Sequence, residues 1–264
     1  MCWEERQKHK LANINQVHLF KRTCAGTGKT IITKYPPENP YKVYDVAYFR
    51  GDDRDPHVYG RDIDFTRPFF EQFRELDLAA PHPALFKDYM RDVNSDYTNY
   101  AGQNKNCYLI FDADENEEVM YAYGTNGSKQ SADCYRCTNL EYCYEMIDAH
   151  NCYGSAFLQS SDNCNSCYFG FQLTNCDHCI MCSNLVNASY QYQNKPITKE
   201  QYEEIVECFQ SYEDLEKTHI AFNEFIQQFP RPATVKYRTQ NVVGNCIVDS
   251  KNTSLAFDSM NVET

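Results

Sequence analysis

The sequence predicts a mainly β protein, a right-handed β-solenoid that follows an α+β N-terminal unit and precedes two helices. Two observations favour this fold class. Asn and Cys recur together at short spacings from about Cys107 to Asn187, and self-similarity at a short period is typical of stacked repeats. The 264 residues also include 21 Tyr, 16 Phe and 14 Cys, and aromatic and small polarizable side chains suit β structure.

Changes in composition along the chain predict four segments. Residues 1–92 combine short apolar runs, prolines and one apolar helical face, which predicts an α+β unit with a basic arm. Residues 94–195 contain the Asn/Cys/aromatic repeats and are expected to form the solenoid. Residues 196–230 show two helical patterns, and the first opens with a capping box at Thr198. Residues 231–264 return to the repeat texture and are interpreted as a resumed, truncated solenoid.

The first segment gives local signals that can be tested individually. Residues 24–30 are Gly-rich and predict a turn. They partly match a phosphate-binding loop, but Thr23 stands where that loop needs glycine, so the turn is favoured. The runs 31–35 and 41–44 flank a Pro-rich stretch, which predicts a hairpin-like pair. Thr66 is expected to cap the helix that follows it.

The spacing of the Asn-Cys units, nine or twelve residues, constrains the size of one coil. A strand rises about 3.3 Å per residue, so a single unit gives too short a path to close around side chains. We therefore expect two units, roughly 18 to 24 residues, in each coil. Cys134, Cys152 and Cys176 would then stack on one side. Cys143 and Cys164 would stack on the other, and a twelve-residue coil is the alternative geometry.

Asn is expected at the corners of the coils. Its side chain tolerates a left-handed backbone and can hydrogen-bond to an equivalent residue on the next coil. Cys, which is small and apolar, is expected to fill the narrow interior.

The charge distribution and the absence of apolar runs limit the classes of partner and the cellular compartment that we expect. Net charge is −12, but residues 1–34 carry seven Lys/Arg and two Glu, a balance of +5, which leaves −17 for the rest. An acidic body argues against a broad nucleic-acid surface, whereas the arm 1–34 could contact nucleic acid. The chain shows neither a secretory signal nor a run of about 18 apolar residues. We therefore expect a cytoplasmic protein without a membrane segment, whose thiols are reduced or metal-bound.

Pairs of cysteines separated by two residues indicate a zinc site. This spacing lets two thiolates grip one zinc ion. The predicted ligands, with His178 nearby, are Cys164, Cys167, Cys176 and Cys179. The alternative is that Cys is the interior residue of each coil, because Cys107, Cys143 and Cys152 recur without such a partner. Zinc is the one cofactor that the sequence implies.

Two acidic segments could in principle bind a cation. Asp112, Asp114 and Asn116 begin like a calcium loop, but the glycine and the bidentate Glu of that loop are missing. The loop 51–65 is rich in Asp and contains His57, which could supply a metal or an acid/base site. Solvated acidic turns explain both segments more simply.

Several motifs follow one another in a specific order along nearly the whole chain. They are Cys-x3-Arg at the start, Tyr-Gly-Arg-Asp-Ile-Asp-Phe, Arg-Pro-Phe-Phe-Glu-Gln-Phe, Asn-Ser-Asp-Tyr-Thr-Asn, the Asn-Cys repeats and Asn-Lys-Pro-Ile-Thr-Lys-Glu-Gln-Tyr. The chain resembles an uncharacterised Cys-rich repeat family of metagenomic, reduced-genome bacteria, usually with an N-terminal zinc-ribbon-like segment. The resemblance implies architecture only. It also implies that Cys2 is the tail of a zinc ribbon whose first Cys pair is absent here.

Three functions are compatible with these patterns. A non-enzymatic interaction scaffold with a protein partner is favoured, because the repeats present an aromatic-rich surface and no catalytic arrangement is recognisable by spacing. The second hypothesis is a zinc-binding protein whose arm contacts nucleic acid. The third is a glycan-acting enzyme, since β-solenoids can host such chemistry and carboxylates are plentiful. In that enzyme His150, beside Asp148, could act as a general base.

Overall fold

The computed structural model describes residues 4–5, 8–9, 14–52, 54–88, 90–136, 138–148 and 150–263. It contains two compact units, which we describe separately. The larger unit spans Asn15–Phe225, and the smaller one combines Met1–Ile14 with Ile226–Thr264.

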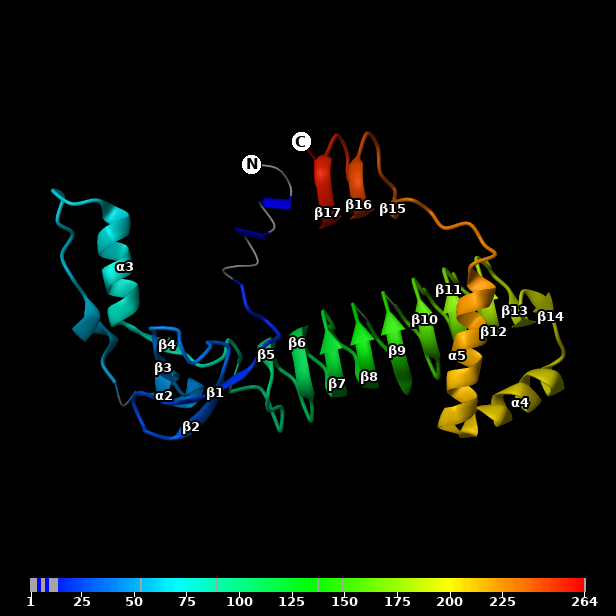
Figure 1. Cartoon of the computed structure of the whole chain (residues 1–264), viewed down its shortest axis with the longest axis horizontal. Coiled ribbons are helices and arrows are strands. Elements are labelled where there is room, and N and C mark those ends of the chain that lie inside the picture. The colour runs from blue at the N-terminus through cyan, green and yellow to red at the C-terminus, as the bar shows by residue number, and fades with distance from the viewer. Residues whose placement is uncertain are drawn as a thin grey trace. The chain divides into compact units, whose positions relative to one another are not determined.

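A ten-stranded sheet forms most of the larger unit. Its strands lie side by side in the order of the sequence, as the row from β5 to β14 in Figure 1 shows. Each pair is parallel except the last, β13 with β14. The strands are β5 (Asn99–Gly102), β6 (Tyr108–Asp114), β7 (Glu117–Tyr123), β8 (Lys129–Tyr135), β9 (Cys143–Ile147), β10 (Ala156–Gln159), β11 (Tyr168–Phe171), β12 (Asp177–Ser183), β13 (Ser189–Tyr192) and β14 (Lys195–Pro196). The protein is therefore mainly β, and its sheet is solenoid-like, as predicted.

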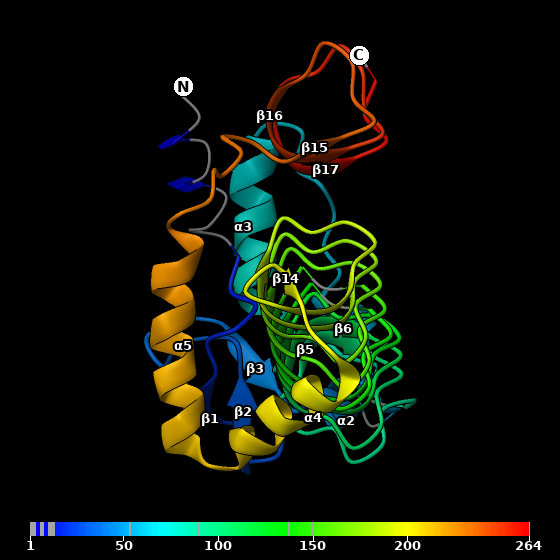
Figure 2. The ribbon, with the colours of Figure 1, turned by 90° about the vertical axis from the view of Figure 1, so that its right-hand side faces the viewer.

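Each coil of this stack is twelve residues long. Tyr108 is the register partner of Met120, and Tyr168 is the partner of Ile180. The same shift of twelve holds from β5 to β13, and Figure 2 shows the coils end-on as closely stacked loops. The expected coil of two repeat units is therefore wrong, and the twelve-residue alternative is correct.

The short coil closes because the backbone turns at every third residue. In one coil the residues with positive φ, between 51° and 61°, are Asn106, Leu109, Asp112 and Glu115. A left-handed residue reverses the local direction of the chain, so the path is not that of an extended strand. Estimating the coil from strand rise alone therefore gave too long a repeat.

The residue after each left-handed position points into the core. In the same coil these residues are Cys107, Ile110, Ala113 and Asn116, all at most 2% exposed. The period of twelve then stacks four inward columns along the axis. The expected cysteine stacks are wrong, because Cys152, Cys164 and Cys176 share one column, at a shift of twelve. Cys167 and Cys179 lie in a second column with Cys143, and Cys134 is paired with Met146 in a third.

The corner asparagines hydrogen-bond from coil to coil, as predicted. Asn151 Nδ2 donates to Asn139 Oδ1 over 2.9 Å, and Asn163 Nδ2 donates to Asn151 Oδ1 over 2.8 Å. Asn175 continues the ladder with a bond of 3.0 Å to Asn163, and its φ is positive at 48°. Side-chain amides at this corner thus fix the same register as the backbone ladder.

Two helices follow the sheet. In α4 (Lys199–Glu207), Thr198 is the N-cap and forms the predicted capping box with Gln201. The 3-10 turn η2 (Cys208–Gln210) leads to α5 (Tyr212–Ile226). Ser211 Oγ accepts a hydrogen bond from the Asp214 N–H, which satisfies one of the free donors at the start of α5.

The N-terminal elements of the larger unit form two small sheets. β1 (Phe20–Thr23) and β2 (Thr30–Thr33) are an antiparallel pair, and the predicted turn at residues 24–30 joins them. β3 (Lys42–Tyr44) pairs in parallel with β4 (Pro81–Pro83). The expected pairing of residues 31–35 with 41–44 is therefore wrong. The Gly-rich turn competes better for β2, since Gly28 supplies a φ of +72°.

Three short helices complete this region. They are α2 (Val46–Arg50), the 3-10 helix η1 (Pro56–Tyr59) and α3 (Phe69–Ala79). Pro68, rather than Thr66, is the N-cap of α3, and no side chain caps it. Cys24, Val43 and Leu85 form part of the buried core of these elements.

The smaller unit repeats the parallel arrangement. β15 (Lys236–Tyr237), β16 (Val243–Val248) and β17 (Ser254–Met260) form a three-stranded parallel sheet. The register shifts between Val243 and Gly244, where a bulge interrupts the β16–β17 pairing. The return of repeat texture after residue 231 thus corresponds to parallel strands.

Tyr35 makes the stability of the larger unit sensitive to alkaline pH. Burial, followed by the neighbouring Tyr41, Tyr100 and Asp77, raises the pKa of Tyr35 to about 12 from 10.0. The folded state holds this proton more tightly than the unfolded chain, so the contribution is complete below about pH 10 and disappears as pH rises towards about 12. We expect Tyr35→Phe to lose less stability than the parent between about pH 9 and pH 11 in urea unfolding. Equal losses would contradict this assignment.

Candidate functional site

The four predicted zinc ligands lie inside the coils. Cys164, Cys167, Cys176 and Cys179 are at most 1% exposed. They belong to a group of thiols that shift one another's pKa, from Cys152 and Cys164 through Cys167 to Cys179. Cys179 also shifts the pKa values of Cys176 and Cys182. We call this group the thiol core, and its members are Cys152, Cys164, Cys167, Cys176, Cys179 and Cys182.

The surroundings of the thiol core shift the pKa values of its members in both directions. The hydrogen bond with Cys164, followed by burial, raises the pKa of Cys152 far above its usual value. Contacts with Cys164 and Cys179, followed by burial, do the same for Cys167. The pKa of Cys164 is lowered, because Cys152 and Cys167 hydrogen-bond to its sulfur. The hydrogen bond with Cys179 likewise lowers the pKa of Cys182.

The structure explains the Cys-x2-Cys spacing without a metal. Every third residue points inward, so cysteines three apart are consecutive core residues on adjacent sides of a coil. Within the described ranges, no group of three or more His, Cys, Asp or Glu residues is arranged to hold a metal ion. His178 lies outside the thiol core, with Nδ1 2.8 Å from Asp177 Oδ1 and its ring stacked on Tyr190. The zinc assignment stays a prediction.

The other sequence candidates do not converge on one site. His150 Nδ1 lies 3.5 Å from Asp162 Oδ1 rather than pairing with Asp148, and it is largely exposed. Asn116 is buried in the core, so it cannot share a calcium loop with Asp112. Asp55 accepts a hydrogen bond from the His57 N–H and caps η1.

Several predictions concern residues outside the described ranges. Cys2 and part of the basic arm belong to these residues. In the described part of the arm, the Arg22 guanidinium donates to the Pro36 and Tyr41 carbonyls. Lys34 Nζ donates to the Tyr100 hydroxyl. Arg22 and Lys34 therefore make hydrogen bonds between segments of the larger unit.

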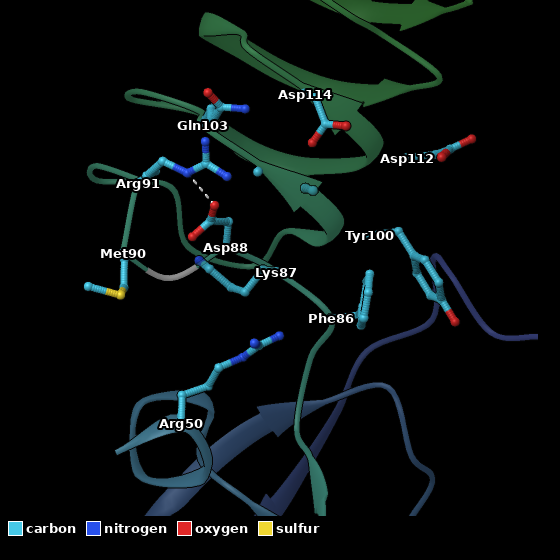
Figure 3. Close-up of a pocket in the computed structure, with 12 residues that line it drawn as sticks. Arg50, Phe86, Lys87, Asp88, Met90, Arg91, Tyr100, Gln103, Asp112 and Asp114 are labelled. Carbon is cyan, nitrogen blue, oxygen red and sulfur yellow. Dashed lines mark hydrogen bonds and ion pairs between the residues drawn. The ribbon is translucent and has the colours of Figure 1, made fainter. Parts of the chain in front are cut away.

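A surface cavity of about 630 Å³ lies where α2 and the segment after β4 meet the first coils (Figure 3). Its lining residues are Arg50, Phe86, Lys87, Asp88, Met90, Arg91, Tyr100, Ala101, Gly102, Gln103, Asp112 and Asp114. Phe86 and Tyr100 lie ring to ring at 5.3 Å along one wall. None of the lining residues is Ser, Thr, Cys or His.

Charges of both signs line this cavity and partly neutralise each other. Arg91 Nε donates to Asp88 Oδ2 over 2.5 Å, and this bond lowers the pKa of Asp88. Burial raises the pKa of Asp114 on the opposite wall. Lys87 Nζ lies 3.3 Å from Asp92 Oδ2 and donates to the Ser95 carbonyl. The arrangement offers charged hydrogen-bonding groups of both signs to a small polar group.

One side of the solenoid carries mostly aromatic and apolar residues, interrupted in the middle coils by Asp133 and Glu145. Each coil contributes one outward strand residue and the left-handed residue after it. We call these pairs the aromatic side, and they are Tyr108–Leu109, Met120–Tyr121, Ala132–Asp133, Tyr144–Glu145, Ala156–Phe157, Tyr168–Phe169 and Ile180–Met181.

The later coils of the aromatic side are covered by the chain's own helices. Phe169 is 0% exposed, and its ring lies 6.0 Å from Phe222 of α5 and 5.7 Å from Phe209 of η2. His219 of α5 lies 5.7 Å from Phe157. Figure 2 shows α5 running beside the stacked coils. This end of the aromatic side is thus packed against α5 and η2 of the same chain.

The early coils of the aromatic side are bare. Tyr108 is 39% exposed and Tyr121 is 51% exposed, although their rings pack edge to face at 5.8 Å. Tyr97, two coils before Tyr121 at the same position, is 39% exposed and packs on Tyr108 at 5.5 Å. Met120 is also exposed. The same surface that binds helices in the later coils is therefore open to solvent in the early ones.

The sequence analysis missed both the cavity and the aromatic side. The cavity joins residues from segments far apart in the chain, which no local spacing reveals. The aromatic side has a signal, because Tyr97, Leu109 and Tyr121 recur at twelve and again at Phe157 and Phe169. If each coil is assumed to contain two repeat units, successive members of that series fall on alternating sides of the solenoid. The alignment of these residues on one side is then not visible in the sequence.

Comparisons with known proteins do not identify a family. No family model matches the chain, and no curated protein matches it. One solved structure, a candidate acetyltransferase from Bacillus cereus, is 8% identical and covers 53% of this chain and 93% of its own, with a TM-score of 0.15. At that TM-score the likeness carries no argument. Among the described residues, no helix has the length and apolar character that a membrane crossing requires.

Proposed function

We propose that this protein is a non-enzymatic binding scaffold whose aromatic side docks a helix of a protein partner. The scaffold would be a right-handed β-solenoid. The observation that carries the proposal is the contrast between the two ends of one surface, covered by α5 near Phe169 and bare near Tyr108 and Tyr121. A contiguous exposed aromatic patch on a soluble protein typically marks an interaction site.

The geometry of the bare end favours a helical occupant. Positions on this side repeat with the coil spacing, and the chain's own α5 already packs across that spacing through His219 and Phe222. Because Tyr97, Tyr108 and Tyr121 continue the same columns, they offer a second helix the same type of contact. Apolar residues on one face of an amphipathic helix would fill the gaps between the rings.

The charge around the bare end predicts the polarity of the partner. Asp96, Glu118 and Asp133 are exposed beside the tyrosines, and the whole chain has a net charge of −12. An acidic partner would be repelled, whereas lysines or arginines beside the apolar face would be attracted. The proposed partner is therefore a basic amphipathic helix.

A labelled peptide can test the proposal by fluorescence anisotropy. The probe carries the sequence of residues 212–226, with its exposed acidic residues Glu213, Asp214, Glu216 and Glu224 replaced by Lys. We expect this peptide to bind the full chain and the unmodified acidic peptide to bind at least tenfold more weakly, because charges at the rim set electrostatic complementarity.

Variants of the full chain locate the peptide. The double variant Tyr108→Ala/Tyr121→Ala should lower the affinity at least tenfold, since buried aromatic anchors carry most of the binding free energy. Tyr153→Ala is the matched control, because Tyr153 is 54% exposed but lies outside the aromatic side. Circular dichroism checks that each variant is folded. A peptide that does not bind, or an equal loss in the control, would refute the proposal.

A further inference from the structure

Three cationic side chains line the cavity that Figure 3 shows, and two of them are already paired. Arg91 Nε donates to Asp88 Oδ2. Lys87 Nζ lies 3.3 Å from Asp92 Oδ2. Arg50, the last residue of α2, points towards the cavity, and within the described ranges its guanidinium takes part in no ion pair or hydrogen bond. Arg50 is therefore available to bind an anionic group of a ligand.

Carboxylates line the opposite side of the cavity. Asp112 and Asp114 belong to β6, and Figure 3 shows Asp114 pointing into the cavity from the side opposite Arg50. Burial and, to a lesser degree, nearby carboxylates such as Asp112 raise the pKa of Asp114. A ligand ammonium group placed beside Asp114 would compensate the charge that this setting disfavours. The cavity therefore offers a cation on one side and carboxylates on the other.

A third side of the cavity is aromatic. The rings of Phe86 and Tyr100 lie 5.3 Å apart, and two contacts hold the pair in place. The Phe86 N–H donates to Asn99 Oδ1 over 2.9 Å, and Lys34 Nζ lies 4.9 Å from the centre of the Tyr100 ring. Phe86 is 53% exposed. Its ring is therefore free to pack against a flat apolar group of a ligand.

The cavity has room for a molecule whose charges are far apart. Its volume of about 630 Å³ is typical of pockets for small organic ligands. Gly102 lines it without a side chain, and a Cβ there would lie 3.1 Å from Asp88 Cβ and 3.2 Å from Asp114 Oδ1. The absence of a side chain at Gly102 thus keeps the space beside Asp114 open. Because Arg50 and Asp114 lie on opposite sides, a ligand that reaches both needs its charges at opposite ends.

We propose that the cavity binds a short zwitterionic peptide with an aromatic side chain. Its carboxylate pairs with Arg50, its ammonium group pairs with Asp114, and its ring packs on Phe86. An extended tripeptide spans about 10 Å, so its charged ends are separated and its central side chain lies between them. A nucleotide fits less well, because Asp112 and Asp114 repel its phosphates. This site is separate from the aromatic side and does not depend on helix docking there.

Isothermal titration calorimetry of the full chain tests the proposal with four peptides. The main probe is Gly-Phe-Gly with free termini. Its N-acetyl derivative lacks the ammonium group, its C-terminal amide lacks the carboxylate, and Gly-Ala-Gly lacks the ring. We expect Gly-Phe-Gly to bind and each of the other three to bind about tenfold more weakly, because each loses one charge-assisted hydrogen bond or one aromatic contact.

Two substitutions match each end of the peptide to one side of the cavity. Arg50→Gln should bind Gly-Phe-Gly about tenfold more weakly but bind the C-terminal amide as the parent does, since the amide has no carboxylate to pair. Asp114→Asn should likewise weaken Gly-Phe-Gly and leave binding of the N-acetyl derivative unchanged. A variant that merely disturbed the cavity would weaken all the peptides alike. Arg74→Gln is the matched control, because Arg74 is exposed on α3 and does not line the cavity.

Three results would overturn the proposal. The first is an absence of Gly-Phe-Gly binding by the full chain, shown to be folded by circular dichroism. The second is an N-acetyl derivative that binds as tightly as the free peptide, which would make the cavity a site for anions. The third is an equal loss of Gly-Phe-Gly and of its amide in Arg50→Gln, or the same loss of Gly-Phe-Gly in Arg74→Gln.

Discussion

Replacing Asn116 by Ala should lower the free energy of unfolding by about 3 kcal/mol. The side chain is 1% exposed. Its Nδ2 donates to Asn104 Oδ1 over 3.0 Å and to the Thr125 carbonyl over 2.9 Å, and its Oδ1 accepts from the Ser128 N–H over 2.9 Å. Alanine leaves the buried Ser128 N–H without its partner, which costs about 1–3 kcal/mol, and it removes two further hydrogen bonds, to Asn104 Oδ1 and to the Thr125 carbonyl, which contribute about 1 kcal/mol each. Urea unfolding followed by circular dichroism measures the change.

Asn163 provides the matched control for this prediction. It belongs to the exposed corner ladder, with amide bonds to Asn151 and Asn175. Water can replace both partners there, so Asn163→Ala should cost less than about 1 kcal/mol. If the two variants lost the same stability, interior hydrogen bonding would not be what distinguishes the positions. The comparison therefore isolates burial, because both residues make side-chain amide bonds to the next coil.

Asn116 also shows what the sequence could and could not predict about the solenoid. The repeat, its Cys interior and its Asn corners followed from residue types, since each type has a distinct physical preference. The coil length did not follow, because it depends on backbone conformation. Residues such as Leu109 and Tyr121 adopt positive φ, at 51° and 53°. Side chains of these types rarely do so, and composition gives no warning of it.

Recognising that buried residues recur at every third position would have given the coil length from the sequence. Cys107, Ile110 and Ala113 are followed at steps of three by Asn116 and Val119, all buried. This series mixes apolar, small and amide side chains, so it carries no simple hydrophobic signal. The cysteines drew attention to nine and twelve, which are multiples of three. The Cys-x2-Cys spacing that suggested zinc is thus the three-residue step between side chains that point into the core.

The sequence predicted that aromatic residues would be abundant on the surface of the repeats, but it did not predict where on the surface they lie. Abundant Tyr and Phe indicated a binding scaffold, but their placement on one side requires the correct coil length. Whether an aromatic residue is bare or covered depends on where α5 packs. Phe169 and Tyr121 occupy equivalent positions in different coils, and one is 0% exposed while the other is 51% exposed. Long-range packing of that kind is not encoded in local periodicity.

Phe169→Ala should release η2 and α5 from the solenoid while the coils stay folded. The Phe169 ring stacks on Phe157 at 4.5 Å and contacts His219 and Phe222 of α5 at 6.1 and 6.0 Å. Truncating a buried Phe costs about 3–5 kcal/mol. Coils in a stack are stabilised mainly by their neighbours, so we expect the loss to fall on the helix interface.

Hydrogen exchange of backbone amides measures this release. A loss of about 3 kcal/mol corresponds to roughly a hundredfold faster exchange in α5. Amides in β6 and β7, far along the stack, should keep the exchange rates of the parent. Tyr153→Ala is the control for a surface tyrosine that contacts neither helix. Faster exchange spread evenly over all coils, with α5 unchanged, would contradict the prediction.

The same variant connects the fold to the proposed function. Without α5, the covered part of the aromatic side around Phe157 becomes accessible, in addition to the bare part formed by Tyr108 and Tyr121. If helix docking is a property of the whole side, Phe169→Ala should bind additional copies of the basic probe peptide, although it lacks one aromatic anchor. If the bare tyrosines alone form the site, the stoichiometry should stay that of the parent. The number of peptides bound therefore tells whether α5 occupies a site that a partner helix could otherwise use.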